Sequence, residues 1–537
     1  MTKQTENNLT ALLTTEEKIS LQTGFGCWNT APIEKLKVRS VTFADGPVGL
    51  RKMQDGKTLP AVAFPSVAKL SCSFDPDLLR SVGTAVGEQC RAEGVDVLLA
   101  PGINIKRDPR CGRNFEYFSE DPFLTAELAN AYIAGVNSQN VGVCLKHFAA
   151  NNYEYGRMVS DSVVDERALR EIYLNAFERV IKKSEPCAVM CSYNKLNGEY
   201  CSQDKRLLTD ILRGEWGFKG LTVSDWGATD DRAKGLNSGL DLEMPQGDVR
   251  KVASAVENSE LDVSVLDGVC DRVIALSRKF DNSAPRGVDY DYQHEACRKI
   301  SAECTVLVKN NCKLLPLKKT DEIAVIGALA ETPVFQGGGS SKVNAYKTDN
   351  FLSALDGADI KYAYAQGYAL DGEENENLVD EAVNTAQKYD KVILFVGDKA
   401  DREERDRADY GLPKAQLRVI DAVTSANSNV VIVLQSGSSV DVSWSGAAKA
   451  MLIDYYGGEH SGRATFDVIF GDVCPSGRLA ETWYSDLPDY LNGDCGYKRR
   501  LYKESIYVGY RYCVTADVPV AFPFGYGLSY NDIKWSS

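Results

Sequence analysis

The stretch LTVSDWG at residues 221–227 decides the fold. Its first half is a short apolar run typical of a buried strand, and Asp225 and Trp226 follow where that strand ends. The same arrangement recurs in SVTFADGP (40–47), VDVLLAPGIN (95–104), VGVCLKHFA (141–149), CAVMCSYN (187–194) and SGLDLEMP (238–245). Helical patterns such as ERALREIYLNAFERVIKK (166–183) separate the runs. Repeated βα units over about 250 residues predict a (β/α)8-like TIM barrel.

Polar side chains at the ends of these runs form a candidate site, because barrel enzymes carry their chemistry at the C-terminal ends of the strands. The set comprises Asp45, Arg113, Lys146, His147, Arg157, Tyr193 and Asp225. Such a mixture suits a sugar: carboxylates accept hydroxyl protons, basic groups donate hydrogen bonds, and an aromatic such as Trp226 faces the apolar side of the ring.

Each of these residues also has a purely structural interpretation. Asp225 could cap its strand, His147 could be a core histidine, and the arginines could form structural ion pairs. Tyr193 and Trp226 could serve packing alone. If the candidate site cleaves a glycosidic bond, it needs a second carboxyl group besides that of Asp225. The candidates for this second carboxyl group are Glu116, Glu120 and the acidic loop DKADREERDRAD (398–409). By default, such a charge run is a solvated loop.

A second α/β pattern follows the barrel pattern. Its predicted strands are EIAVIG (322–327), KVILFVGD (391–398), NVVIVLQSG (429–437) and KAMLIDYYGG (449–458). We expect a barrel domain at 1–280, a linker at 281–292 and a smaller α/β sandwich at 293–537. The segment GGGSSKV (337–343) matches no nucleotide-binding spacing, and we expect it to reach over the sugar pocket.

Composition limits the partners. The 537 residues carry a formal net charge of -14, which disfavours nucleic acid and anionic membranes and is compatible with a neutral sugar. The 15 cysteines have no paired spacing, and the N-terminus has no apolar signal core, so we expect reduced thiols and a cytoplasmic protein. The motifs call for no metal and no cofactor. Nothing in the composition excludes a homo-oligomer.

Ten motifs in order resemble glycoside hydrolase family 3, and together they cover nearly the whole chain. In the first half they are DGPVGLR (45–51), GRNFEYFSEDP (112–122), KHF (146–148), NNYEYGR (151–157), MCSYNKLNG (190–198) and SDWGA (224–228). In the second half they are VLVKNNCKLLPL (306–317), GGGSSKV (337–343), FGDVCPSGRLAETW (470–483) and FPFGYGLSY (522–530).

The resemblance implies roles for these residues. Asp225 falls on the family's nucleophile, and Tyr193 is expected to approach it and the ring oxygen of the sugar. The residues implied to hold the sugar hydroxyls are Asp45, Arg113, Lys146, His147 and Arg157, and Trp226 is expected beside them.

The resemblance also implies the acid/base residue. The family's EGxDR-like segment falls on EERDRADYGLP (403–413), which makes Glu403 the acid/base. Glu404 stands where the family usually has glycine, whose backbone angles a glutamate resists, so Glu404 remains an alternative. We expect burial and the nearby Asp225 to raise the pKa of Glu403 and to keep it protonated.

The implied activity is that of a retaining β-glycosidase, most simply a β-glucosidase that releases terminal β-D-glucosyl residues through a covalent glycosyl-enzyme. A β-xylosidase of the same family is an alternative, as is a sugar-binding homologue without catalysis. The family's β-N-acetylglucosaminidases and phosphorylases use a KHxPGHG-like loop, and KHFAANN here counts against both.

Overall fold

The computed structural model describes residues 9–280, 282, 284, 286–398, 401–491 and 498–531. In this part of the chain, five parallel strands form one curled sheet in the order β3–β7–β8–β10–β13. These strands are β3 (Phe43–Ala44), β7 (Val97–Leu98), β8 (Gly142–Phe148), β10 (Ala188–Cys191) and β13 (Leu221–Val223). Each lies inside one of the predicted apolar runs, and the strands follow one another in chain order. The domain is therefore α/β and TIM-like.

The sixth predicted run, 238–245, forms bridges rather than a strand. Leu242 pairs with Val223, and Glu243 pairs with Thr23 at the start of the hairpin β1 (Gly24–Phe25) and β2 (Asn29–Thr30). The regular ladder cannot continue through Pro245, because proline has no N–H to donate. The hairpin in turn reaches β3, since the N–H of Phe43 donates to the carbonyl of Trp28. These contacts lead the curled sheet from β13 back to β3.

Helices pack around this sheet, and two of the long ones begin at Asp-Pro pairs. Asp75 and Asp121 cap the N-termini of their helices with their side chains, and the proline that follows each occupies the first helical turn, where no N–H is needed. The helices are α1 (Thr15–Leu21), α2 (Val67–Ser71), α3 (Pro76–Ala92), α4 (Pro122–Ser138), α5 (Glu166–Ala168), η4 (Leu169–Tyr173), α6 (Asn175–Ser184), η6 (Arg206–Glu215), α7 (Arg232–Ser238), α8 (Val249–Glu257) and α9 (Val263–Lys279).

The second domain is built on a sheet that has six strands among the described residues, in the order β14–β20–β19–β18–β15–β17. The strands are β14 (Val306–Asn310), β15 (Ile323–Ile326), β17 (Tyr362–Ala365), β18 (Lys391–Gly397), β19 (Val430–Gln435) and β20 (Ala450–Ile453). Only β14 runs antiparallel to its neighbour. The helices of this domain are α10 (Tyr290–Cys304), α11 (Phe351–Asp356), α12 (Glu376–Ala386), α13 (Lys414–Ala426) and α14 (Ser461–Ile469).

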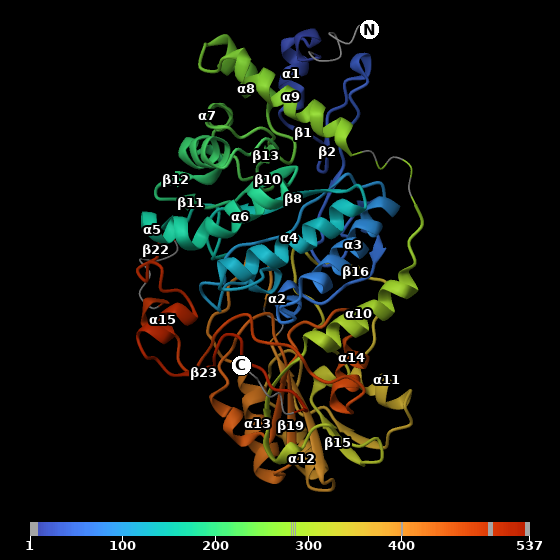
Figure 1. Cartoon of the computed structure of the whole chain (residues 1–537). Coiled ribbons are helices and arrows are strands. Elements are labelled where there is room, and N and C mark those ends of the chain that lie inside the picture. Colours follow the sequence, from blue (N-terminus) through green and yellow to red (C-terminus); the bar gives the residue numbers. More distant parts are fainter. Residues whose placement is uncertain are drawn as a thin grey trace, which may run out of the picture.

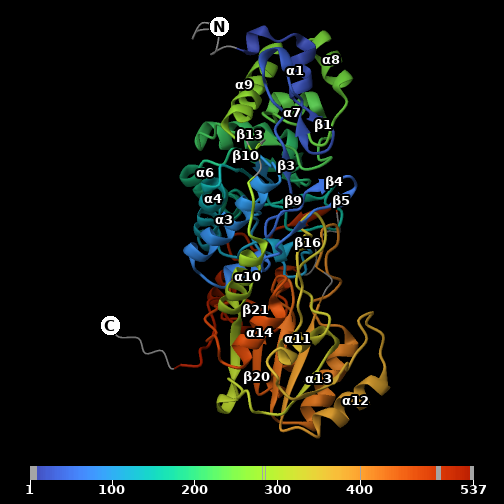
Figure 2. The ribbon, with the colours of Figure 1, turned by 90° about the vertical axis from the view of Figure 1, so that its right-hand side faces the viewer.

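All four strands predicted for this domain are present, whereas β14 and β17 were not predicted. The two domains stack along the long axis of the molecule, with α10 beside their junction (Figures 1 and 2). Helix α10 begins at Tyr290, inside the segment predicted as the linker. Residues 281, 283 and 285 of that segment lie outside the described residues.

The C-terminal segment returns to the barrel domain, which the sequence did not reveal. Strand β22 (Arg499–Leu501) pairs with β9 (Asp161–Val163) in a sheet that also holds β11 (Lys195–Leu196) and β12 (Glu199–Tyr200). Beyond it, Tyr502 and Val508 belong to the hydrophobic core of the barrel. In Figure 1 the red segment with α15 (Tyr510–Thr515) lies below β22, at the lower edge of the barrel domain.

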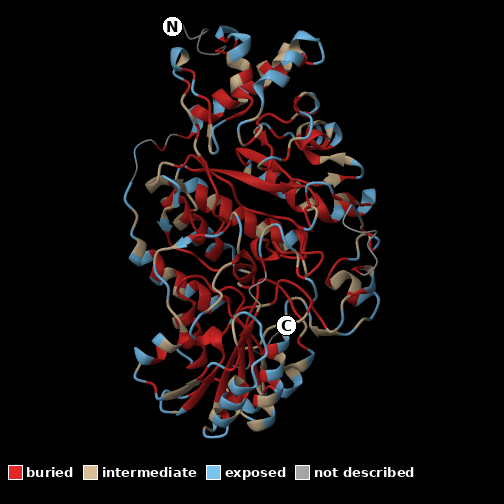
Figure 3. Cartoon of the chain, turned by 180° about the vertical axis from the view of Figure 1, so that it is seen from behind, coloured by how far each residue is buried: buried red, intermediate tan, exposed pale blue. Residues whose placement is uncertain are grey.

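A buried ion pair holds this segment in place. Glu504 accepts hydrogen bonds of 2.5 and 2.9 Å from the guanidinium of Arg107, and both side chains are almost fully buried. Figure 3 shows that buried residues fill both sheets and continue through the region where the domains meet. None of the described helices is both long enough and apolar enough to cross a bilayer.

Candidate active site

The predicted site residues of the barrel lie where its strands end. Asp45 directly follows β3, and Asp225 comes two residues after β13. Lys146 and His147 lie at the C-terminal end of β8. They line a cavity of about 260 Å³. The second domain supplies part of the wall: Gly339 and Ser340 from the glycine-rich loop, and Arg402, Glu403 and Glu404 from the acidic loop. The prediction that GGGSSKV reaches the pocket is confirmed.

Every residue predicted for the site lines this cavity except Arg157, which lies behind Glu403 and donates to it. Sequence reasoning missed Trp28, Arg51, Met190, Ser340 and Arg402 as lining residues. Four of them had a signal, because Arg51, Met190 and Ser340 lie within the motifs DGPVGLR, MCSYNKLNG and GGGSSKV, and Arg402 lies in the acidic loop. Trp28 had none, because it comes from the hairpin that completes the barrel.

Asp225 is a buried carboxylate with one oxygen turned to the cavity. Its Oδ1 accepts the N–H of Trp226 at 2.8 Å, and its Oδ2 has no hydrogen-bond partner among the described residues. Burial raises the pKa of Asp225, Arg113 opposes that rise, and Glu403 adds to it. An unpartnered carboxylate oxygen at the cavity is the arrangement that a nucleophile needs.

His147 lies next to Asp225, with 3.6 Å between its Nε2 and Oδ2 of the aspartate. Burial and the positive charges of Arg113, Lys146 and Arg157 hold the pKa of His147 well below its usual value, so the ring is neutral. The hydroxyl of Tyr117 lies 3.1 Å from Nδ1. A hydrogen bond from Tyr117 to Nδ1 leaves the proton on Nε2, where it faces the cavity.

Asp45 lies between two cations. Its carboxylate is 3.5 Å from Nζ of Lys146 and 3.4 Å from Nη1 of Arg51. Burial nevertheless raises the pKa of Asp45 to about 6, because Lys146 and Arg51 offset only part of the desolvation. The carboxyl group of Asp45 can therefore be ionised at neutral pH and can accept hydrogen bonds from two hydroxyl groups.

Two indole rings form the aromatic wall. Trp226 packs on Trp28 with ring centroids 5.2 Å apart, and its Nε1 donates to the carbonyl of Cys27 at 3.0 Å. Tyr193 donates to the carbonyl of Trp226 at 3.2 Å, and the guanidinium of Arg157 lies over its ring. These aromatics thus pack on one another and also line the cavity.

The expectation that the pKa of Glu403 is raised is wrong for this arrangement. Burial alone would raise it, but the positive charges of Arg113 and Arg157 outweigh burial and hold the pKa of Glu403 well below its usual range. Arg157 donates to Oε1 at 2.8 Å, and Arg113 lies 3.8 Å from the same oxygen. The N–H of Ser340 donates to Oε2 at 2.7 Å. Glu403 is therefore an ionised carboxylate held by both domains.

Glu404 differs from Glu403 in exposure and in backbone. Its side chain is 71% exposed, against 13% for Glu403, and its nearest cation is Arg157 at 3.4 Å. The backbone of Glu404 has φ 73°, which is the left-handed region that favours glycine. The two barrel alternatives do not line the cavity: Glu116 pairs with Arg113, and Glu120 accepts hydrogen bonds from Thr482 and Tyr510.

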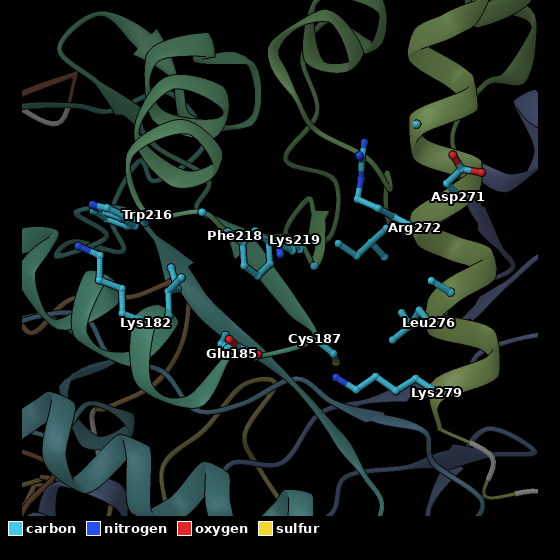
Figure 4. Close-up of a pocket in the computed structure, with 17 residues that line it drawn as sticks. Lys182, Glu185, Cys187, Trp216, Phe218, Lys219, Asp271, Arg272, Leu276 and Lys279 are labelled. Carbon is cyan, nitrogen blue, oxygen red and sulfur yellow. The ribbon is translucent and has the colours of Figure 1, made fainter. Parts of the chain in front are cut away.

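A larger cavity of about 590 Å³ opens at the opposite ends of the barrel strands (Figure 4). Trp216 and Phe218 form its apolar part, and Lys219 and Lys279 lie around it. It contains none of the residues that the motifs single out, so we assign the chemistry to the smaller cavity. The residues that the structure describes hold no group of three or more His, Cys, Asp or Glu side chains that could bind a metal.

A TIM-like domain with a buried carboxylate at a strand end, and a second carboxylate across the cavity, defines a glycoside hydrolase. The chain matches the glycosyl hydrolase family 3 N terminal domain over residues 29–276 and the glycosyl hydrolase family 3 C-terminal domain over residues 305–530. It belongs to glycosyl hydrolase family 3.

Relatives with known names agree with this assignment. The chain is 45% identical to thermostable beta-glucosidase B of Acetivibrio thermocellus, with 98% of this chain and 72% of that protein aligned. It is 42% identical to the exo-alpha-(1->6)-L-arabinopyranosidase of Bifidobacterium longum, over 96% of this chain and 72% of the relative.

Solved structures are also similar. The GH3 beta-glucosidase of Bifidobacterium adolescentis aligns with a TM-score of 0.93 and 41% identity, over 96% of this chain and 78% of that one. Beta-glucosidase 3B from Thermotoga neapolitana, solved in complex with alpha-D-glucose, aligns with a TM-score of 0.90 and 33% identity, over 98% and 83%.

Proposed function

We propose that this enzyme is a retaining β-glucosidase in which Asp225 is the nucleophile and Glu403 the acid/base. The observation that carries the proposal is the unpartnered Oδ2 of Asp225, which faces the same cavity as Glu403 from the other domain. Relatives named as β-glucosidases, and a similar structure solved with glucose, support the choice of substrate.

The reaction proceeds by double displacement. Asp225 attacks the anomeric carbon while Glu403 gives its proton to the departing oxygen, and a glycosyl ester forms on Asp225. Glu403 then takes a proton from water, which attacks the anomeric carbon and frees Asp225. The negative charge of Glu403 raises the pKa of Asp225, and formation of the ester on Asp225 removes the charge interaction between the two groups before the second step.

The remaining residues would bind the sugar. The Asp45 carboxylate accepts hydroxyl protons, while Lys146 and the Nε2 proton of His147 donate hydrogen bonds. Arg113 has an Nη1 without a hydrogen-bond partner among the described residues, which leaves it able to donate to a hydroxyl. Trp226 would cover the apolar side of the ring or of the leaving group.

The stereochemistry of the product tests the mechanism. Proton NMR of the first minutes of hydrolysis should show β-glucose before mutarotation, because two inversions retain the configuration. Asp225→Ala should lose several orders of magnitude of activity, and azide should restore part of it while forming α-glucosyl azide. Early α-glucose, or near-normal activity of Asp225→Ala without azide, would contradict the proposal.

Substrate choice is tested separately. Initial rates on aryl β-glucoside, β-xyloside and α-L-arabinopyranoside should favour the glucoside. The arabinopyranoside is included because relatives at 42% identity carry that activity in their names. A faster rate on either pentoside would reassign the substrate without changing the mechanism.

For the fold, we propose the finer description as a (β/α)8-like barrel followed by an α/β sandwich. The bridges that lead from β13 back to β3, and the helices packed against the second sheet, support it. We also propose that the enzyme works in the cytoplasm, because the described cysteines are all free thiols and most are buried. Activity in a cell fraction washed free of cytoplasm would contradict the second point.

A further inference from the structure

Glu154 lies directly behind the acid/base residue, and the motif analysis did not single it out. It comes from the barrel loop 151–157 and is only 2% exposed. Arg157 donates from the same nitrogen, Nη1, to Oε2 of Glu154 and to Oε1 of Glu403, at 2.8 Å in both cases. The two carboxylates therefore share one guanidinium nitrogen, each accepting one of its two N–H groups, and they divide the positive charge of Arg157 between them.

A second contact ties Glu154 to the loop that carries Glu403. The backbone N–H of Glu404 donates to Oε2 of Glu154 at 2.8 Å. The other oxygen, Oε1, is buried and has no hydrogen-bond partner among the described residues. Glu154 thus fixes the backbone next to Glu403 through one oxygen and keeps the other in a dry environment without a donor.

The charges around Glu154 do not balance. Arg113 and Arg157 supply two positive charges, while Glu116, Glu154, Glu403 and the exposed Glu404 supply four carboxylates. Burial raises the pKa of Glu154 to about 7, against the opposing charges of Arg113 and Arg157. Cys111 and Tyr117 also face the cluster, and their pKa values are raised by burial, so both are neutral.

We propose that Glu154 is a positioning residue that, by competing for Arg157, allows the acid/base Glu403 to carry a proton. While Glu154 is ionised it satisfies most of the charge of Arg157, and the electrostatic attraction that keeps Glu403 ionised is weakened. Without the charge of Glu154, Arg157 acts on Glu403 with only the exposed carboxylate of Glu404 beside it. This inference rests on the proposed role of Glu403, and it accounts for how a carboxylate beside two arginines can act as an acid.

The variant Glu154→Gln tests the proposal, because glutamine can still accept the N–H of Glu404 but carries no charge. In its pH profile of kcat/KM on an alkyl β-glucoside, the fall on the alkaline side should begin about one pH unit lower than in the wild type. Near neutral pH this shift amounts to about a tenfold loss of rate. The rate on a dinitrophenyl glucoside should change less than about threefold, because such a leaving group departs without a proton. Glu154→Asp keeps the charge, so its kcat/KM should fall on the alkaline side at the same pH as in the wild type.

The controls separate the two proposals. If Glu154→Gln lowers the rates on both substrates equally at every pH, Glu154 is merely structural and the inference is wrong. The same conclusion follows if the fall on the alkaline side stays at the pH of the wild type. If Glu403→Ala shows no greater loss on the alkyl glucoside than on the dinitrophenyl glucoside, the acid/base assignment itself fails, whatever Glu154 does.

Discussion

At the scale of single residues, the surroundings of Glu403 show how neighbouring charges can reverse the direction of a pKa shift. Burial favours the protonated form of Glu403, yet two guanidinium groups within 4 Å of one of its oxygens outweigh burial. Glu404 is one residue further along the chain and reaches only the edge of this environment. The backbone N–H of Glu404 donates to Glu154 at 2.8 Å, and its exposed carboxylate lies 3.4 Å from Arg157.

The leaving-group dependence of two variants should therefore separate Glu403 from Glu404. Glu403→Ala should reduce hydrolysis of cellobiose by more than about a hundredfold and that of a dinitrophenyl glucoside far less, since only the first needs an acid. Azide should rescue this variant with formation of β-glucosyl azide. Glu404→Gln should retain the leaving-group dependence of the wild type. If the two variants exchange behaviours, Glu404 is the acid/base.

At the scale of elements, two loops from different domains meet at Asp406. Its carboxylate accepts the N–H groups of Gly112, Glu154 and Tyr155. It thereby fixes the barrel loop 151–157 against the acidic loop, and Glu403 lies three residues before it. The position of Glu403, the proposed acid/base, thus depends on backbone hydrogen bonds that cross the domain junction.

Asp406→Asn should weaken both the fold and the activity. The asparagine would turn N–H donors toward backbone N–H groups, which costs about 1–3 kcal/mol. We expect a lower midpoint of thermal unfolding and a kcat/KM that falls by about ten- to a hundredfold on cellobiose. Asp409→Asn is the matched control: it removes the same charge from the same loop, and the exposed side chain can still accept the N–H of Gly411. Equal behaviour of the two variants would refute the role of Asp406.

The elements divide into those that local patterns predict and those that they do not. Strand β13 and the residues after it were predictable, because an apolar run followed by polar residues is a local signal. The register of EERDR was predictable only from the resemblance. The sharing of Arg157 between Glu154 and Glu403 was not, because it joins loops about 250 positions apart. Strand β22 is a three-residue RRL with no periodicity, and it pairs Arg499 with Asp161 of β9, which is still more distant in sequence.

At the scale of the whole molecule, the C-terminal segment returns to the barrel domain and packs against it. Removal of the charge of Glu504 leaves Arg107 buried without its partner, and breaking such a pair costs about 3–5 kcal/mol. Glu504→Gln should therefore lower the midpoint of thermal unfolding by several degrees, as measured by circular dichroism.

Glu166→Gln gives the matched comparison on the surface. The carboxylate of Glu166 is 58% exposed and pairs with Arg170 and Arg206, so its loss should cost less than about 1 kcal/mol. A midpoint for Glu504→Gln as high as that of Glu166→Gln would show that the C-terminal segment contributes little to the stability of the barrel.

The division of the two carboxylates between domains has a consequence for biosynthesis. While the ribosome is still translating the second domain, the emerged barrel holds Asp225 but lacks Glu403, the proposed proton donor, and the loop that supplies Ser340 is not yet docked. Domains emerge and fold in order from the N-terminus. A nascent or prematurely released chain can thus be folded in part and still be silent toward glycosides, so hydrolytic activity reports completed synthesis and docking of both domains.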